Sequence, residues 1–491
     1  MKVVKNYLYN ISYNILTLVL PLITGPYVSR RLGATGVGIN SYTYSIINWF
    51  VLCGSIGIAY YGNRQIAYVK ENKYALTQNF VELQILKSIF ILLSYSIFII
   101  YICINKNYIY YLLIQSIYII AAGLDISWLY MGLENFKITV IRNTLVKVSS
   151  VILILILVKD KSDTGIYISI MAIGTLLGNL TLWPSLTKVL LKINWHDLHP
   201  FRHLRGSISL FIPLAAVQLY VGLNKTMLGA LDSTNASGFY DKADSLVKLV
   251  LTLVTSLAGV LMPYTAKSVA SGDMKKVKNV LYLAFDFSSF VAFPIAFGIA
   301  GISIKFGPFF YGKEFKEVGI ALFIESIVMV FMSWSSITGN QYLVPTNQVK
   351  PYTVSIFIGA FVNIILNVPL ILNFGVKGAV VSTVLAELAV SFYQIWYIRK
   401  EVDIKIMFNN TLKYFVSSLI MFIIVFILNS KLEMNILTLI FEISIGCFIY
   451  LCLIFILKPT IINYINDFIV TTVNKIKSIK REKSENNSCE L

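Results

Sequence analysis

Residues 80–103 read FVELQILKSIFILLSYSIFIIYIC, a stretch that supplies the ~20 residues a helix needs to cross a bilayer. Isoleucine, leucine and phenylalanine follow one another without the continuous polar face that a water-soluble helix presents. Such a stretch predicts a helix buried in hydrocarbon.

Similar apolar stretches recur about fourteen times along the chain. Every backbone amide in lipid needs an internal partner, and no alternating ten-residue strand pattern occurs, so the spans are expected to be helical. The sequence therefore predicts an all-α polytopic membrane protein. The expected spans are 8–31, 37–62, 80–103, 107–130, 139–158, 165–187, 207–231, 239–266, 278–304, 317–340, 352–373, 377–398, 411–430 and 434–457.

Composition and charge agree with this class. The 491 residues are 57% hydrophobic and 13% charged, with a mean hydropathy of +0.74, which excludes a soluble or a disordered protein. With a cytoplasmic N-terminus, inner loops hold about 25 basic residues and outer loops about 10. The net charge of +17 is thus explained by membrane topology rather than by nucleic-acid binding, and both termini are expected in the cytoplasm.

A short glycine-containing pattern occurs twice. LGATGVGI at 32–39 follows the first span, LDSTNASGF at 231–239 follows the seventh, and Gly38 and Gly238 are 200 residues apart. This spacing fits a parallel duplication of six spans, although two short turns that each need glycine would look the same. We expect lobes at 1–205 and 206–405, a C-terminal pair of spans at 406–458 and a basic amphipathic cytoplasmic tail at 459–491.

No constellation for catalysis or for cofactor binding emerges. Residues 307–313 match G-x-x-x-x-G-K, but Glu314 stands where a nucleotide site needs Ser or Thr. The histidines at 196, 199 and 203 are interrupted by Pro200, and the five cysteines show no metal spacing. We expect no enzyme activity, cofactor, metal or nucleotide.

Polar residues form stripes in two of the expected spans. In the first span Asn10, Asn14, Thr17, Pro21 and Thr24 recur at helical spacing. A second stripe, in the second span, consists of Asn40, Tyr44 and Asn48. Such stripes line a wet cavity or bond neighbouring helices, and for any single residue the two roles are equally plausible.

Charged residues deep in the spans are more discriminating, because a charge in hydrocarbon costs at least ~2.5 kcal/mol. The basic residues could line a cationic route for an anionic head group such as pyrophosphate. Local pairing of Lys87 with Glu82, and of Lys248 with Asp244, is the alternative; Lys147 has no acid nearby in sequence. The candidate substrate-binding cations are Arg30, Arg31, Arg64, Lys87, Lys147, Lys225 and Lys248. The candidate ion-coupling acids are Asp286, Glu325 and Glu387, which could equally neutralise these lysines.

Three segments resemble the Wzx-type polysaccharide-transport flippases of the MATE/MOP superfamily: PYVSRRLG at 26–33, GNR at 62–64 and NKTMLG at 224–229. The resemblance implies two rocking lobes in a bacterial inner membrane that move an undecaprenyl-diphosphate-linked oligosaccharide outward for capsule or O-antigen export. It assigns the anionic head group to Arg30, Arg64 and Lys225, whereas Asn224 stands where many relatives have an acid.

Other functions remain open at this level. A lipid II flippase would also have a basic interior, and a multidrug exporter of the same superfamily would need an acidic one. A membrane polysaccharide polymerase would need large outer loops with catalytic Arg or His. Expected partners are the lipid-linked saccharide, membrane lipids and, as a further candidate, polymerase or export machinery, with no nucleic acid.

Overall fold

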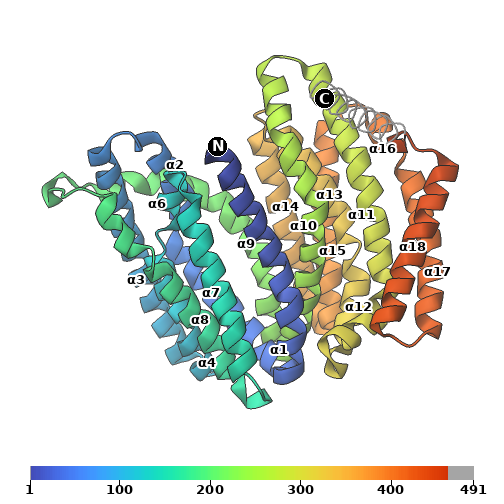
Figure 1. The fold of residues 1–491 in the computed structure, drawn as a ribbon, viewed down its shortest axis with the longest axis horizontal. Helices are drawn as coiled ribbons and strands as arrows, with labels where there is room; N and C mark the ends of the chain where they lie inside the picture. The colour runs from blue at the N-terminus through green and yellow to red at the C-terminus, as the bar shows by residue number, and fades with distance from the viewer. Residues whose placement is uncertain (1, 463–491) are drawn as a thin grey trace, which may run out of the picture. The chain divides into compact units, whose positions relative to one another are not determined.

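The computed structural model describes residues 2–462, without the side chains of 2–15 and 136 and of several positions within 213–221 and 253–264. The described chain is helical and contains no strand (Figure 1). The principal helices are α1 (Lys2–Ser55), α2 (Ile58–Val69), α3 (Lys73–Ile104), α4 (Ile109–Gln115), α5 (Ile117–Leu124), α6 (Ser127–Gly132), α7 (Phe136–Leu157), α8 (Thr164–Leu180), α9 (Leu204–Leu231), α10 (Thr234–Ala270), α11 (Met274–Tyr311), α12 (Lys316–Glu325), α13 (Val328–Ser336), α14 (Val349–Phe374), α15 (Val376–Ile398), α16 (Ile404–Phe408), α17 (Thr411–Lys431) and α18 (Ile436–Leu457). Short helical turns are η1 (Lys161–Asp163), η2 (Trp183–Lys188), η3 (Trp195–Asp197), η4 (Pro200–His203), η5 (Lys313–Phe315) and the π-helix η6 (Ile337–Leu343).

Length and composition make ten of the described helical segments able to cross a membrane, or up to eleven when a pair bent by 48° counts as one span. The predicted all-α polytopic class is confirmed at this level. The predicted tail at 459–491 lies almost wholly outside the described residues.

The chain forms two compact units. Unit 1 contains residues 1–249, 306–324 and 356–386, and unit 2 contains 250–305, 325–355 and 387–491. The lobes predicted from the duplication divide the chain at other positions and stay a prediction.

A break in α1 separates the first two expected spans. Gly33 has φ 68° and ψ −177°, a backbone region open essentially to glycine alone. Because the break interrupts the helical hydrogen bonds, the Ala34 N–H is available and donates to Glu314 Oε2 at 2.8 Å. Glu314 Oε1 also accepts from Lys161 Nζ at 2.6 Å, so one carboxylate joins α1, η1 and η5 within unit 1.

We predict that Gly33→Ala lowers the free energy of unfolding by about 1–3 kcal/mol, because alanine is strained at this φ and ψ. Its methyl group would also stand 2.8 Å from Glu314 Oε2. Thermal unfolding in detergent measures the effect. Gly298→Ala is the control, because its added methyl group would be 3.7 Å from Met421, an ordinary contact. Equal stability of both variants would contradict the prediction.

The two copies of the glycine pattern meet within unit 1. A Cβ on Gly38 would stand 2.4 Å from the Thr234 carbonyl oxygen, and one on Gly238 would stand 2.8 Å from Gly38 Cα. Beside them Ser41 Oγ donates to the Ser237 carbonyl at 3.1 Å, and the two hydroxyl oxygens are 3.0 Å apart. The second half of α1 and the start of α10 therefore touch backbone to backbone, in a contact that we call the glycine seam.

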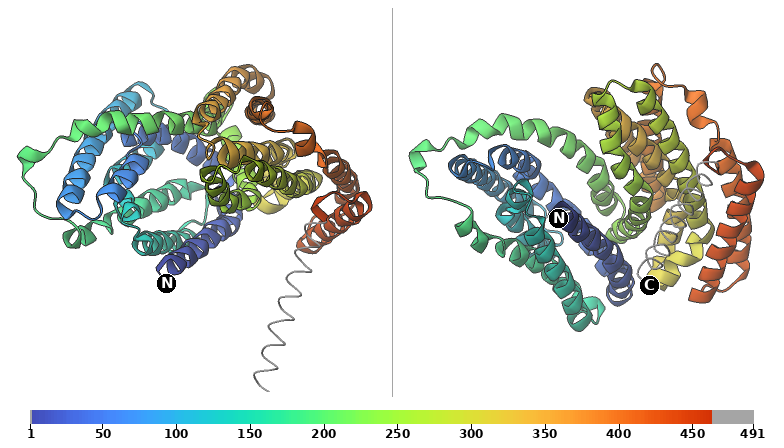
Figure 2. Two further views of the ribbon diagram at one scale, coloured as in Figure 1. Left: turned by 90° about the horizontal axis from the view of Figure 1, so that it is seen from above. Right: turned by 45° about the horizontal axis from the view of Figure 1, so that its top comes forward.

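In unit 2, α17 and α18 form a helical hairpin, drawn side by side in Figures 1 and 2. Asn435 begins α18 with a capping box, in which its side chain accepts from the Thr438 N–H. The buried Glu442 of α18 accepts a hydrogen bond from Asn429 of α17 at 3.1 Å. The two helices are candidate spans by length and composition, and their standing as a separate C-terminal pair at 406–458 stays a prediction.

Candidate functional site

A cavity of about 450 Å³ lies within unit 1, lined by α1, α7, α8, α10 and the last turn of α11. Its volume is typical of small-molecule sites. Along α7 it extends from Arg142 to Ile154, roughly 18 Å at 1.5 Å per residue. The polar side chains in its wall are Thr17, Thr24, Arg142, Asn143, Lys147, Ser150, Tyr167, Thr175, Asn179, Lys242, Ser245 and Tyr311.

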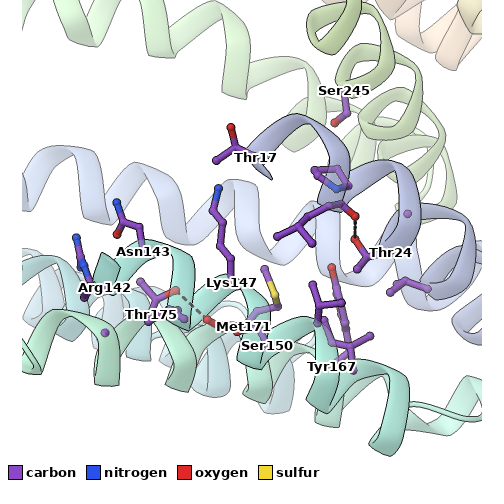
Figure 3. A pocket seen from close by; sticks show the side chains of 18 of the residues that line it. Thr17, Thr24, Arg142, Asn143, Lys147, Ser150, Tyr167, Met171, Thr175 and Ser245 are labelled. Carbon is purple, nitrogen blue, oxygen red and sulfur yellow. Dashed lines mark hydrogen bonds between the residues drawn. The ribbon is translucent and has the colours of Figure 1, made fainter. Parts of the chain in front are cut away.

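Helix α7 provides most of the polar wall. Arg142, Asn143, Lys147 and Ser150 follow at spacings of one, four and three residues, which place them on one helical face. In Figure 3 the Lys147 side chain reaches from α7 toward Thr17 of α1. The helix thus presents two cations to one cavity.

Close packing of α8 against α7 orients this face. A Cβ on Gly178 would stand 2.5 Å from Val146 Cγ2, so the G-x-x-x-G pattern of α8 allows the close approach that such patterns provide. Asn179 then accepts a hydrogen bond from the Arg142 guanidinium and donates to the Ala121 carbonyl at 2.7 Å. The guanidinium is therefore held in place at the cavity wall.

The facing wall comes from α1. Thr17, Pro21 and Thr24 of the predicted polar stripe line the cavity, and Thr24 Oγ1 donates to the Leu20 carbonyl at 2.9 Å. The other stripe members, Asn10 and Asn14, belong to α1, but their side chains lie outside the described part. The described residues of the stripe thus lie where a cavity wall is expected, and a role of the stripe in substrate binding stays a prediction.

A third cation comes from α10. Lys242 Nζ lies 5.8 Å from the ring centroid of Tyr311, and the Tyr311 hydroxyl donates to the Lys242 carbonyl at 3.4 Å. The cavity lining includes no acidic residue among the described positions. In this low-dielectric setting, three basic side chains favour a ligand that carries negative charge.

Of the cavity-lining residues on α7 and α10, the sequence analysis identified Lys147 but not Arg142, Asn143 and Lys242. Arg142 and Asn143 could have been identified, because they lie at helical spacing from Lys147. Lys242 had no such signal, since its place in the cavity depends on a contact between segments far apart in sequence.

Two predicted lysines form ion pairs instead of lining the cavity. Lys248 Nζ lies 2.7 Å from Asp244 Oδ1, which confirms the local pairing considered for it. Lys225 pairs with Asp241, an acid that sequence analysis did not single out.

Lys87 and Arg64 also lie away from the cavity lining. Lys87 is buried and donates to the Asp125 carbonyl at 2.7 Å, while Glu82 pairs with Arg202, so the alternative of a local Lys87–Glu82 pair is wrong. Arg64 packs on the Tyr61 ring, with its guanidinium carbon 5.6 Å from the ring centroid.

Arg30 and Arg31 bond helix ends. Arg30 Nη2 donates to the Phe309 carbonyl near the end of α11 at 2.7 Å, and Arg31 Nη1 donates to the Lys159 carbonyl after α7 at 3.4 Å. Cations suit these positions, because helix C-termini carry partial negative charge. Both arginines line a separate open pocket of about 470 Å³.

The second polar stripe serves helix packing. Asn40 Oδ1 accepts from Gln115 Nε2 at 3.3 Å, and the Tyr44 ring packs edge to face on Tyr118 with centroids 5.2 Å apart. Asn48 is half-buried. Asn40 and Tyr44 thus make interhelical contacts, and whether they also contact substrate stays a prediction.

Asn224 belongs to a buried network of neutral groups in unit 1. Its Nδ2 donates to Tyr240 Oη at 2.6 Å and to Thr383 Oγ1 at 2.8 Å, and its Oδ1 accepts from Asn367 Nδ2 at 2.6 Å. Asn367 is bonded in turn to Asn363, at 2.9 Å. Amides and hydroxyls that satisfy one another make this a packing element of α9, α10, α14 and α15.

The predicted coupling acids all belong to unit 2. Asp286 of α11 accepts from Tyr414 Oη at 2.9 Å and from Asn410 Nδ2 at 3.1 Å. Glu325 and Glu387 are buried. No group of three His, Cys, Asp or Glu side chains suited to a metal ion occurs among the described residues.

A helical membrane bundle with a cationic internal cavity defines a polytopic protein of transporter architecture. Residues 3–269 match the family described as polysaccharide biosynthesis protein, and the chain belongs to that family. A putative O-antigen transporter of Shigella dysenteriae is 25% identical over 296 residues, which cover 58% of this chain and 72% of the relative.

Solved structures of two transporter types share the fold. A lipid II flippase in an inward closed conformation superposes with a TM-score of 0.71 at 18% identity, covering 94% of this chain and all of that one. An inward-facing multidrug transporter of the MATE family gives 0.60 at 13% identity, covering 80% and 97%. Similarity at these identities defines the fold and leaves the substrate open.

Proposed function

We propose that this protein is a flippase that moves an undecaprenyl-diphosphate-linked oligosaccharide from the inner to the outer leaflet for export of a capsule or O-antigen type of polysaccharide. The observation that carries the proposal is the cavity with Arg142, Lys147 and Lys242 and no acid among its described lining residues. The membership of the family and the names of the relatives support the same substrate class.

The physical need for such a cavity is clear. A diphosphate and its sugars cannot cross ~30 Å of hydrocarbon unaided, whereas the polyprenyl tail is already soluble there. Charge-assisted hydrogen bonds from the three cations replace part of the water lost by the diphosphate. Threonine and asparagine side chains in the wall offer hydrogen bonds to sugar hydroxyls.

The proposed topology has fourteen spans, with both termini in the cytoplasm of a bacterial inner membrane. Support comes from the helix bounds: the Gly33 break divides α1 into two spans, and α9 and α10 cover the seventh and eighth expected positions. The distribution of Lys and Arg between loops sets the orientation.

Transport by alternating access requires the cavity to open to one side at a time. In the proposed topology the glycine seam lies at the outer ends of the second and eighth spans, where opening and closing of its contact would control access from the outer side. We propose that it is the closed outer gate. The proposal also needs a driving force. We propose that an ion or proton couples to one of the three acids, and Asp286 is the preferred candidate because its carboxylate accepts hydrogen bonds from Tyr414 and Asn410.

The test is transfer in proteoliposomes that contain the purified full chain and a fluorescent polyprenyl-diphosphate oligosaccharide. We expect protein-dependent movement of the labelled lipid between leaflets, measured by its accessibility to a membrane-impermeant quencher. The matched control is the same saccharide on a neutral polyprenyl lipid, which should stay in its leaflet. Equal transfer of both lipids, or of neither, would contradict the proposal.

A further inference from the structure

The segment that joins α8 to α9 is irregular and lies at the edge of the α2 and α3 group, as Figures 1 and 2 both show. We call residues 188–205 the strap. One face of the strap is fastened to α3. Leu191 N donates to Thr77 Oγ1 at 3.1 Å, and Gln78 Nε2 donates to the Asp197 carbonyl at 2.7 Å.

The strongest attachment is a buried carboxylate. Glu82 is fully buried, and its Oε2 lies 2.7 Å from Arg202 Nη2 and 2.8 Å from His203 Nε2, while its Oε1 accepts from the His199 N–H at 2.8 Å. The Tyr61 hydroxyl lies 3.2 Å from His203 Nδ1. Burial lowers the pKa of His203, so its ring is neutral at pH 7 and Arg202 balances the carboxylate charge.

This attachment leaves an apolar and basic face turned outward. Trp195 is 74% exposed, Phe201 61% and Leu191 49%, all on a segment that hydrogen bonds hold in place. The exposed basic residues of the strap are Lys188, Lys192, Arg202 and Arg205. Its single acid, Asp197, accepts a hydrogen bond from the Tyr74 hydroxyl at 2.9 Å.

Exposed aromatic rings beside lysine and arginine are typical of the membrane interface, where the rings enter the head-group layer and the cations meet phosphates. In the proposed topology the strap is an inner loop, so it faces a leaflet rich in anionic lipids. We propose that the strap is a binding surface for anionic phospholipid, held in its binding geometry by the Glu82 attachment. The proposal does not depend on which substrate the protein moves.

Quenching of tryptophan fluorescence by brominated lipid tests the proposal on the full chain in nanodiscs. We expect brominated phosphatidylglycerol, mixed into phosphatidylcholine, to quench more strongly than the same fraction of brominated phosphatidylcholine. The excess should disappear in Trp195→Phe, because that ring reports on the strap. An equal excess in parent and Trp195→Phe would overturn the proposal, as would equal quenching by the two lipids.

A variant without two lysines distinguishes binding of anionic lipid head groups from simple insertion of Trp195 into the bilayer. Each basic residue near an anionic leaflet contributes a factor of about fivefold, so Lys188→Gln with Lys192→Gln should raise the phosphatidylglycerol needed for half-maximal quenching about 25-fold. The control is Lys106→Gln with Lys159→Gln, two lysines of other loops, which should leave the titration unchanged. Unchanged titration in the strap variant, or an equal shift in the control, would overturn the proposal.

Discussion

Lys147→Gln should greatly weaken binding of the lipid-linked saccharide, and so slow its transport at low substrate concentration, while the protein still inserts and folds. Lys147 lies midway along the polar wall of α7, where its ammonium can reach a diphosphate in the cavity. A hydrogen bond from a charged group contributes about 2 kcal/mol, so its loss should weaken binding roughly 30-fold. The proteoliposome assay measures initial transfer rate against substrate concentration.

Two further variants make this prediction specific. Lys147→Arg keeps the positive charge and should retain a measurable part of the transfer rate. Lys137→Gln removes an exposed lysine near the start of the same helix, outside the cavity lining, and should transfer at the parental rate. If Lys147→Gln matched the parent in rate and in half-saturating concentration, Lys147 would have no part in substrate binding.

The all-helical fold class could be predicted from the length of the apolar stretches, because a segment in lipid must satisfy its backbone hydrogen bonds internally and a helix does so. The run at 80–103 lies within α3, which begins where the Asn72 side chain accepts from the Tyr74 and Ala75 N–H groups. The break at Gly33 was less visible, since glycine in an apolar stretch can equally mark a turn or close helix packing. Only the backbone angles of the structure distinguish these uses.

The part of the candidate site that depends on residues of a single helix could be predicted from the sequence. Helical periodicity placed Thr17 and Thr24 on one face of α1, and the cost of a charge in hydrocarbon singled out Lys147 of α7. Helical periodicity does not report which helices meet. Lys225 and Asp241 belong to successive helices, α9 and α10, so their pairing depends on how that hairpin packs.

The predicted duplication stays a prediction, but it pointed to a pair of segments that single residues did not. Gly38 and Gly238 were matched in sequence as equivalent turns, and in the structure their backbones touch. Contact between equivalent segments is expected near an axis that relates two repeats, because only residues close to such an axis can meet their counterparts. A residue larger than glycine at either position would separate the helices.

Ser41→Cys combined with Ser237→Cys should allow transport to be switched off by a disulfide. The serine hydroxyl oxygens are 3.0 Å apart, and a modest rotation of cysteine side chains at these positions brings the sulfurs to bonding distance. In a background without the native cysteines, oxidation should reduce transfer to background, and a reductant should restore it. If the seam is the outer gate, a covalent bond across it prevents opening; if it is static packing, the bond changes nothing.

Each single-cysteine variant is the control and should transfer equally under oxidising and reducing conditions. Cross-link formation is measured separately, by the accessibility of the cysteines to a thiol reagent after denaturation. Full transfer by a completely cross-linked protein would contradict the proposal that the seam is a gate. The proposed substrate would be unaffected, because the parent protein would still transport the lipid-linked saccharide. A misfolded protein would not regain transfer when the disulfide is reduced. Loss of transfer that is reversed by a reductant therefore shows that the seam must open during transport.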